Sequence, residues 1–160
     1  MSAAAPVNAP VEGAALGPRT FAVTRADLRA YADASGDHNP IHLDEAVALS
    51  VGLPGVIAHG MYTMALMARA VTDWFPGAEV REIGSKFTDP VVVPAEGSVE
   101  VVVSATVKSV AEEDGRCVVA LALLVTSAGA KVLGMPKAVV VLPAQSDEPD
   151  ESEQAEESGA

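Results

Sequence analysis

The chain has 160 residues, of which 49% are hydrophobic, and this combination fits one folded domain rather than a disordered chain. Its 22 acidic and 10 basic residues give a formal net charge of −12. A surface of that sign repels phosphate backbones and anionic headgroups, so neither nucleic acid nor a membrane is expected as a partner. The single cysteine, Cys117, cannot form an internal disulfide, which indicates a reducing, cytoplasmic location.

The two ends of the chain differ in composition from the part between them. Residues 1–18 are rich in Ala, Pro and Gly and lack the basic-then-apolar layout of a secretory signal. Residues 144–160 carry seven acidic residues, no basic residue and no large apolar side chain, so they cannot bury enough surface to offset their ordering entropy. We therefore predict a flexible lead-in over 1–18, one domain over 19–143 and a disordered, solubilising acidic tail over 144–160.

Helical patterns occupy the first half of the predicted domain. Thr24 and Asp27 have the spacing of a helix N-cap and an acidic first turn, and Gly36 follows the apolar stripe, so a helix is predicted over 25–34. A second short helix is predicted over 44–50. The next helical stretch, residues 60–73, is apolar almost all round, and a helix of that kind has to be buried.

From residue 79 the hydrophobic pattern changes to the period of two that is typical of strands with one buried face. The predicted strands cover residues 79–93, 99–108, 116–126 and 131–142. The Asp-Gly pair at 114–115 and the Ala-Gly pair at 128–129 predict tight turns, and Pro136 predicts an edge or a bulge in the last strand. This order predicts the α+β class, with an antiparallel sheet that curls around the apolar helix and a second subunit that covers more of it.

Residues 34–44 do not follow the pattern of core and turns. Five polar side chains lie within eight residues, where two short helices meet: they are Asp37, His38, Asn39, His42 and Asp44. Asp and Asn favour tight bends and Pro fixes the backbone, so Gly-Asp-x-Asn-Pro is also a good structural turn. The alternative is a site in which a carboxylate and an imidazole, five residues apart, transfer protons.

Residues 57–61, with the sequence IAHGM, lead into the apolar helix. Free backbone N–H groups at a helix N-terminus, next to a glycine, can stabilise developing negative charge. The alternative is that Gly60 only permits a tight entry into the helix. Taken together, Asp37, His42 and the Gly60 amide are the groups needed to remove a proton beside a carbonyl and to handle a departing oxygen.

Residues 31–44 (YADASGDHNPIHLD), followed by residues 57–61, resemble the hydratase-2 motif of MaoC-like proteins with the hot-dog fold. That family includes R-specific enoyl-CoA hydratases and (3R)-hydroxyacyl-ACP dehydratases. The likeness covers about residues 18–143, and the short chain, with TRADL at 24–28 and Phe-Thr at 87–88, looks most like a HadB-type dehydratase subunit. The resemblance implies one hot-dog domain whose sheet wraps around a central helix, and two such subunits that pair.

The resemblance also implies roles for individual residues. Asp37 and His42 become the catalytic pair, and the Gly60 amide becomes the donor to the thioester oxygen. Four residues are expected to support or contact the substrate: Asn39, His59, Met61 and Met64. Asn39 is expected to orient the Asp37 loop and His59 to support the helix entry, while the methionines are candidates to line an acyl channel. His38 has no expected role, and Asp44 is expected to cap the next helix.

The activity implied by the resemblance is dehydration of (3R)-hydroxyacyl thioesters of CoA or acyl carrier protein to trans-2-enoyl thioesters, or the reverse hydration, in fatty-acid metabolism. No metal and no cofactor are expected beyond the CoA or phosphopantetheine that the substrate carries. A carrier protein would dock at a basic patch, for which Arg69, Arg81 and Lys86 are candidates. The chain is expected to form a homodimer, or a heterodimer with a second hot-dog subunit. Alternatives are a subunit functional only as half of a heterodimeric dehydratase, a non-catalytic acyl-thioester-binding protein and a hot-dog thioesterase.

Overall fold

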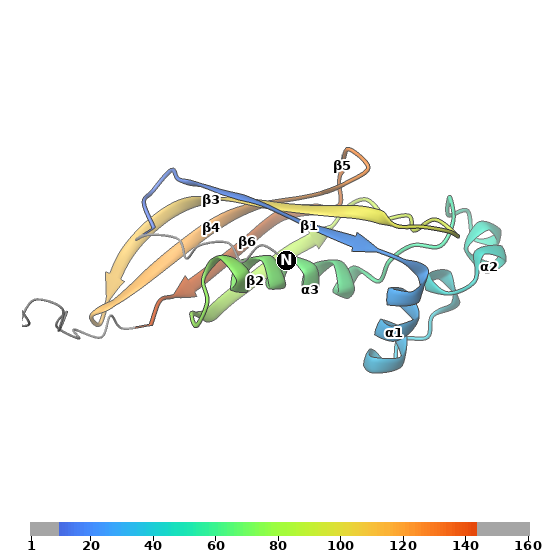
Figure 1. The fold of residues 1–160 in the computed structure, drawn as a ribbon, viewed down its shortest axis with the longest axis horizontal. Helices are drawn as coiled ribbons and strands as arrows, with labels where there is room; N and C mark the ends of the chain where they lie inside the picture. The colour runs from blue at the N-terminus through green and yellow to red at the C-terminus, as the bar shows by residue number, and fades with distance from the viewer. Residues whose placement is uncertain (1–9, 144–160) are drawn as a thin grey trace, which may run out of the picture.

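A six-stranded antiparallel sheet and a long helix form the two layers of the molecule, which the computed structural model describes over residues 10–143 (Figure 1). The strand order is β1-β3-β4-β6-β2, and the short β5 pairs with β4. The strands are β1 Ala15–Val23, β2 Glu79–Phe87, β3 Val99–Glu113, β4 Arg116–Ser127, β5 Ala130–Lys131 and β6 Leu133–Val141. The predicted α+β class with an antiparallel sheet is confirmed. The predictions for residues 1–9 and 144–160 lie outside the described residues.

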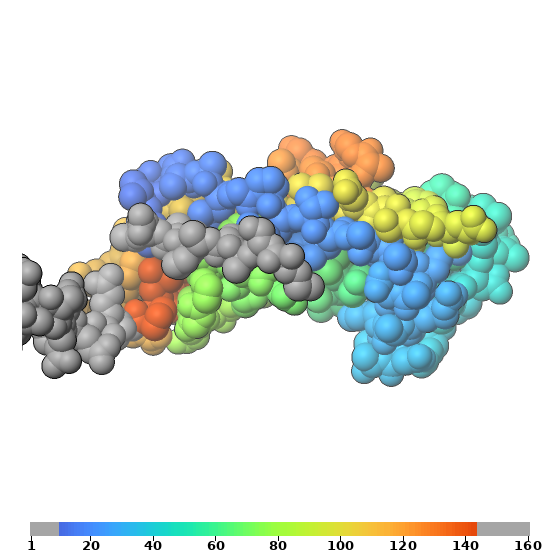
Figure 2. Space-filling view, in the orientation of Figure 1, coloured from blue at the N-terminus to red at the C-terminus, as the bar shows by residue number. Residues whose placement is uncertain are grey.

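The helices all lie between β1 and β2 in the chain. They are α1 Arg25–Ser35, the 3-10 turn η1 Pro40–His42, α2 Glu45–Ser50 and α3 Gly60–Trp74. Figures 1 and 2 show α1, η1 and α2 gathered at one end of the elongated molecule, while α3 runs along one face of the sheet. Among the described residues, no helix combines the length and the apolar character needed to cross a bilayer.

Helix α1 begins at the predicted cap. The Thr24 hydroxyl accepts a hydrogen bond from the Asp27 amide at 3.2 Å, and the Asp27 carboxylate accepts one from the Thr24 amide at 2.8 Å. Gly36 ends the helix with a φ of 78°, which glycine adopts without strain. Local sequence therefore sets where α1 begins and ends, and so where the polar loop after it starts.

The core lies between the sheet and α3. Alternate residues of β3 and one face of α3 supply it, and these buried residues are Val101, Val103, Ala105, Val107, Met67, Ala70, Val71 and Trp74. The Trp74 indole N–H donates a hydrogen bond to the Gly17 carbonyl at 2.9 Å, which attaches the end of α3 to β1. Each large apolar side chain buried here contributes about 1.5–3 kcal/mol.

The predicted central helix is confirmed, but only one face of it is buried in the single chain. Met67 is fully buried, whereas Met64 is half-buried and Met61, on the first turn, is 57% exposed. The sheet covers α3 from one side because it curves past the helix without enclosing it (Figure 1). Met61 exposes an apolar surface at the start of α3, whereas Arg69 and Asp73 form an ion pair further along, so a further covering surface is expected at the start of the helix.

β1 was not predicted as a strand, and β3 continues to Glu113 rather than ending at 108. β1 begins at Ala15, within the predicted lead-in, because Leu16 is buried in the core and residues 15–16 pair with β3. The register shifts between Leu16 and Arg19, so Gly17 and Pro18 interrupt the alternating pattern that marks a strand. β2 ends at Phe87 rather than at 93, since residues 91–93 pair instead with the segment that precedes α3.

The predicted turns are confirmed by their backbone angles. Asp114 and Gly115, with φ of 50° and 74°, join β3 to β4 in a two-residue hairpin, and Ala128 and Gly129 do the same before β5. Pro136 lies in β6 where that strand has left β4 and where its register with β2 shifts. Proline has no backbone N–H, and because β6 does not pair with β4 at Pro136, no hydrogen bond to β4 is lost there.

Candidate active site

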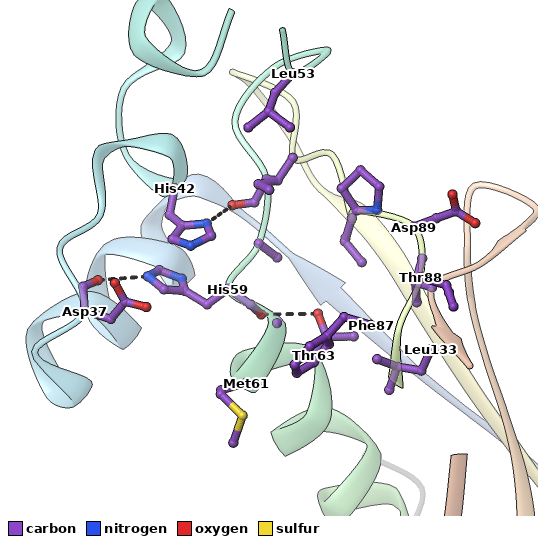
Figure 3. Close-up of a pocket in the computed structure, with 16 residues that line it drawn as sticks. Asp37, His42, Leu53, His59, Met61, Thr63, Phe87, Thr88, Asp89 and Leu133 are labelled. Carbon is purple, nitrogen blue, oxygen red and sulfur yellow. Dashed lines mark hydrogen bonds between the residues drawn. The ribbon is translucent and has the colours of Figure 1, made fainter. Parts of the chain in front are cut away.

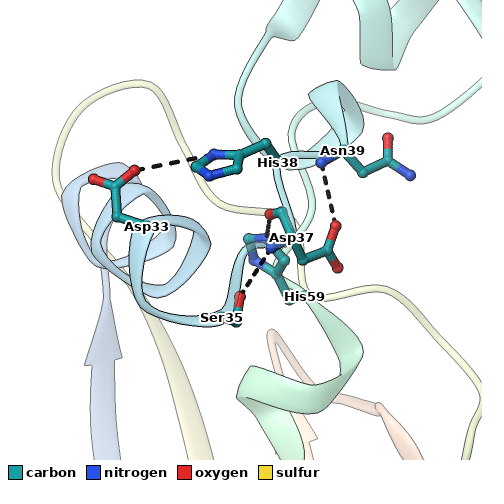
Figure 4. Close-up of polar contacts among 6 residues, drawn as sticks. All are labelled: Asp33, Ser35, Asp37, His38, Asn39 and His59. Atoms are coloured by element: carbon teal, nitrogen blue, oxygen red, sulfur yellow. Dashed lines mark hydrogen bonds and ion pairs between the residues drawn. The ribbon is translucent and has the colours of Figure 1, made fainter.

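The loop after α1 places the Asp37 carboxylate at the mouth of a cavity (Figure 3). The backbone N–H of Asn39 donates a hydrogen bond to Asp37 Oδ1 at 3.2 Å (Figure 4). The Asn39 side-chain oxygen accepts one from the backbone N–H of Ile41 at 3.2 Å. These are the bonds of a tight Asx turn, and the turn leads directly into η1. The turn and the site are therefore one structure rather than alternatives.

His42, at the end of η1, is 8% exposed and its ring nitrogens have different environments. Nδ1 lies 2.7 Å from the Ile57 carbonyl. A carbonyl only accepts, so Nδ1 carries the hydrogen and the neutral ring keeps its lone pair on Nε2. Burial lowers the pKa of His42, which favours this neutral form. The geometry leaves Nε2 able to act as a base.

His59 lies beside His42, with ring centroids 3.9 Å apart and ring planes at 29°. Its Nε2–H donates a hydrogen bond to the Asp37 backbone carbonyl at 3.0 Å (Figure 3). Tyr31 of α1 packs on the same imidazole, at 4.8 Å between centroids. The side chain is 1% exposed, so it is a buried link between the polar loop and the start of α3.

Gly60 is the first residue of α3 and the only one of the three proposed catalytic residues without a functional side chain. Amides in the first turn of a helix have no intrahelical acceptor, so the Gly60 N–H is free to bind a negative charge. A Cβ at this position would lie 2.9 Å from the Phe87 ring. A side chain at this position would therefore displace the Phe87 ring from its place beside the start of α3.

These groups meet in one cavity of about 420 Å³. Its lining is mostly apolar and comprises Asp37, His42, Leu53, Ile57, Ala58, His59, Gly60, Met61, Thr63, Phe87, Thr88, Asp89, Pro90, Val91, Val132 and Leu133. The predicted residues Asp37, His42, Gly60, His59 and Met61 are all in this set. Asn39 and Met64 do not line the cavity: Asn39 shapes the loop, and Met64 lies further along α3.

One wall of the cavity comes from parts of the chain that sequence reasoning did not connect with it. The Ala58 amide donates to the Val91 carbonyl at 2.8 Å, and the Val93 amide donates to the Val56 carbonyl at 2.9 Å. These bonds hold the segment 88–93 alongside the entry to α3. No local signal marks such a pairing, although Pro90 does mark the end of the regular strand before it.

Asp37, His42 and His59 each offer one donor atom, and the three atoms lie within 4.8 Å of one another. Their geometry fits a metal ion poorly. His42 Nδ1 and His59 Nε2 are hydrogen-bonded to carbonyls, and the two rings are stacked. An ion bound in the plane of one ring would lie out of the plane of the other, so both lone pairs could not coordinate it well.

Two of the three candidate docking cations form ion pairs. Arg69 pairs with Asp73 on α3 at 2.9 Å, and Arg81 pairs with Glu113 at 2.6 Å. Lys86 is exposed and forms no ion pair within residues 10–143. A basic docking patch around these residues is therefore smaller than the sequence suggests.

The fold and the motif agree with a family model. Residues 7–124 match the model described as a MaoC like domain, which is more than half of the chain, and the chain belongs to this family. Over 73 residues the chain is 42% identical to 3-hydroxyacyl-thioester dehydratase X of Mycobacterium tuberculosis. That match covers 46% of this chain and 25% of the relative, so the shared segment spans a quarter of the relative's length.

Solved structures show the same architecture. One, described as a MaoC-like dehydratase, has a TM-score of 0.77 and 32% sequence identity, and the match covers 84% of this chain and 41% of that one. Another is the (R)-hydratase from A. caviae involved in PHA biosynthesis, with a TM-score of 0.74 and 25% identity. The match covers 86% of this chain and all of the hydratase. The predicted hot-dog fold is confirmed.

Proposed function

We propose that this chain catalyses the reversible dehydration of (3R)-hydroxyacyl thioesters to trans-2-enoyl thioesters in fatty-acid metabolism. The observation that carries the proposal is the convergence of the Asp37 carboxylate, the His42 imidazole and the Gly60 amide on one apolar cavity. Each group supplies a requirement of the reaction: an acid, a base and a donor to the carbonyl oxygen. The family membership and the activities of the similar proteins support this choice.

In the dehydration direction, His42 Nε2 takes the C2 proton, and the electron pair of that C–H bond moves toward the thioester carbonyl. The Gly60 N–H stabilises the charge on the carbonyl oxygen. When the C2–C3 double bond forms, the C3–O bond breaks, and the hydroxyl leaves as water after it receives a proton from the protonated Asp37 carboxyl group or from a water that Asp37 shares with His42. The proton that His42 took from C2 then passes to Asp37 or to that water, so both side chains return to their starting protonation states. Hydration reverses each step. The redox state of the substrate does not change, so the reaction needs no redox cofactor.

The acyl chain is expected to enter between the start of α3 and the segment 88–93. The apolar residues Val91, Val132 and Leu133 lie on this cavity wall and are buried. The thioester end would lie near Gly60, while the CoA or phosphopantetheine arm extends outward past Phe87. Binding an aliphatic chain in a preformed apolar cavity is favoured by the area removed from water.

A second hot-dog subunit is proposed as the partner, because the cavity mouth is apolar and uncovered in the single chain. Met61 and Phe87 both line the cavity and are each 57% exposed. Either a second copy or a companion hot-dog chain would cover this rim. Light scattering on the purified chain, combined with the activity assay, distinguishes these cases: an active homodimer does not need a companion.

The test of the proposed function is hydration of trans-2-enoyl-CoA by the wild type and by the Asp37→Asn and His42→Ala variants. Each variant is expected to lose on the order of 100-fold or more in kcat. Mutants as active as the wild type would rule out the proposed pair. Tight acyl-CoA binding without turnover would support the binding-protein alternative, and release of free thiol would support a thioesterase.

A further inference from the structure

His59 connects all three groups of the proposed site, yet the proposed mechanism does not use its side chain. It is the N-cap residue of α3 and directly precedes Gly60. Its Nε2–H donates to the Asp37 carbonyl at 3.0 Å, and its ring stacks on His42 at 3.9 Å (Figures 3 and 4). One buried ring thus contacts the loop that carries the acid and the ring that serves as the base.

The environment of the ring nitrogens rules out proton transfer by His59 itself. Nε2 must carry its hydrogen, because the Asp37 carbonyl can only accept. The lone pair is then on Nδ1, which is buried from solvent and has no hydrogen-bond partner in the described part of the chain. An acid or base needs a ring nitrogen that reaches the substrate. Neither nitrogen of His59 does so, and the side chain must act through its neighbours.

The loop that His59 holds has few other attachments. The Asp37 amide donates to the Ser35 hydroxyl at 3.2 Å, and the Asn39 amide donates to Asp37 Oδ1 at 3.2 Å. Both bonds are local to the loop. Among the hydrogen bonds of residues 36–39 in the described chain, the one from His59 alone spans a large sequence separation, 22 residues. This bond is therefore the direct link from Asp37 itself to the start of α3, while the Ile57 amide holds the following turn η1 through the Ile41 carbonyl at 3.3 Å.

We propose that His59 is a positioning residue of the site. Its Nε2–H anchors the Asp37 backbone carbonyl, so that the Asp37 carboxylate and the His42 imidazole meet over the same part of the cavity, and its ring holds the plane of His42. The inference rests on the proposed function for the roles of Asp37 and His42. The titratable groups that contact His59 in the described residues are Tyr31 of α1, Asp37 of the loop and His42 of η1.

Two substitutions of His59 separate the effect of its N–H donor from the effect of its aromatic ring. His59→Gln keeps an N–H donor near the place of Nε2 and removes the ring, whereas His59→Phe keeps a ring and removes both nitrogens. His59→Phe should fold, because it replaces one buried aromatic ring by another and Nδ1 has no partner to lose in the described part of the chain. His38→Gln is the matched control, since its imidazole lies in the same loop but is exposed and outside the cavity.

In the full-length chain, His59→Phe is expected to lower kcat for trans-2-enoyl-CoA hydration on the order of 100-fold, with KM within about twofold of the wild type. His59→Gln should recover most of that loss, and His38→Gln should match the wild type. A fully active His59→Phe enzyme would overturn the proposal. So would a His59→Gln enzyme as impaired as His59→Phe, because the donor would then not be the important feature.

Amide hydrogen exchange of residues 37–39, followed by NMR, tests the anchor without any activity assay. The exchange is expected to speed up on the order of 10-fold in His59→Phe and to stay unchanged in His38→Gln. Unchanged exchange in His59→Phe would overturn the anchoring role even in an active hydratase. Faster exchange in a protein whose wild type hydrates no enoyl-CoA would support the anchor and contradict the proposed function instead.

Discussion

The surroundings of His42 give its imidazole the properties of a base at neutral pH. Burial is the main cause and lowers its pKa below the ordinary value of 6.5. The hydrogen bond to the Ile57 carbonyl acts in the opposite direction, the neighbouring His59 adds to the lowering, and the charge of Asp37 offsets part of it. Because the net shift is downward, the neutral form of His42 predominates at physiological pH.

The pH dependence of activity follows from this shift. A base is active when unprotonated, so a lowered pKa moves the loss of activity to lower pH. We expect the midpoint of the fall in kcat/KM for enoyl-CoA hydration to lie below pH 6.5, the ordinary value for an imidazole. A pH–rate profile measures this. A midpoint above pH 6.5 would show that another group controls the reaction or that His42 is not desolvated.

The contact between Gly60 and Phe87 makes a second prediction at the level of single residues. In Gly60→Ala the new Cβ would lie 2.9 Å from the Phe87 ring, so the ring must move within the cavity. We expect kcat/KM to fall on the order of 10-fold or more, since small misplacements in a site are costly. Gly84→Ala is the control, because a Cβ there has no neighbour within 4 Å. Equal activity of the two variants would contradict a role for this contact.

Among the secondary-structure elements, α3 combines a core face and a cavity face. Two methionines on this helix allow the contributions of the two faces to stability to be compared: Met67 is fully buried, and Met61 is 57% exposed. For the single chain, at a dilution where light scattering finds a monomer, Met67→Ala is expected to lower the free energy of unfolding by about 2–5 kcal/mol, and Met61→Ala by less than about 0.5 kcal/mol. Urea unfolding of both variants tests this. Equal losses would mean that Met61 is covered, as it would be in a dimer.

The elements also show what local sequence predicts and what it does not. The cap at Thr24, the Asp-Gly turn at 114–115 and the extent of α3 follow from interactions between residues close in the chain, and they were predictable. The stacking of His42 on His59 was not, because two separate elements bring the rings together. The wall formed by residues 88–93 was hidden for the same reason: it is held by backbone bonds to residues 56–58 that no side-chain pattern encodes.

At the scale of the whole molecule, the excess of negative charge predicts how kcat/KM for a carrier-bound substrate depends on ionic strength. The formal net charge is −12, and two of the three candidate docking cations form ion pairs. An acyl carrier protein is itself acidic, so its encounter with this chain should be repulsive. We expect kcat/KM for a carrier-bound substrate to rise severalfold when the ionic strength increases from about 0.01 to 0.15 M, because salt screens the repulsion. A fall with added salt would indicate an attractive basic patch instead.

The placement of Trp74 gives the molecule an internal optical reporter. It is the sole tryptophan of the chain, and it lies at the end of α3 away from the cavity, with its indole bound to the carbonyl of Gly17 in an edge strand. If that strand detaches from the sheet, the indole gains water and its emission moves to longer wavelength. Tryptophan fluorescence therefore reports the detachment of β1 from the sheet separately from ligand binding in the cavity, without an added label.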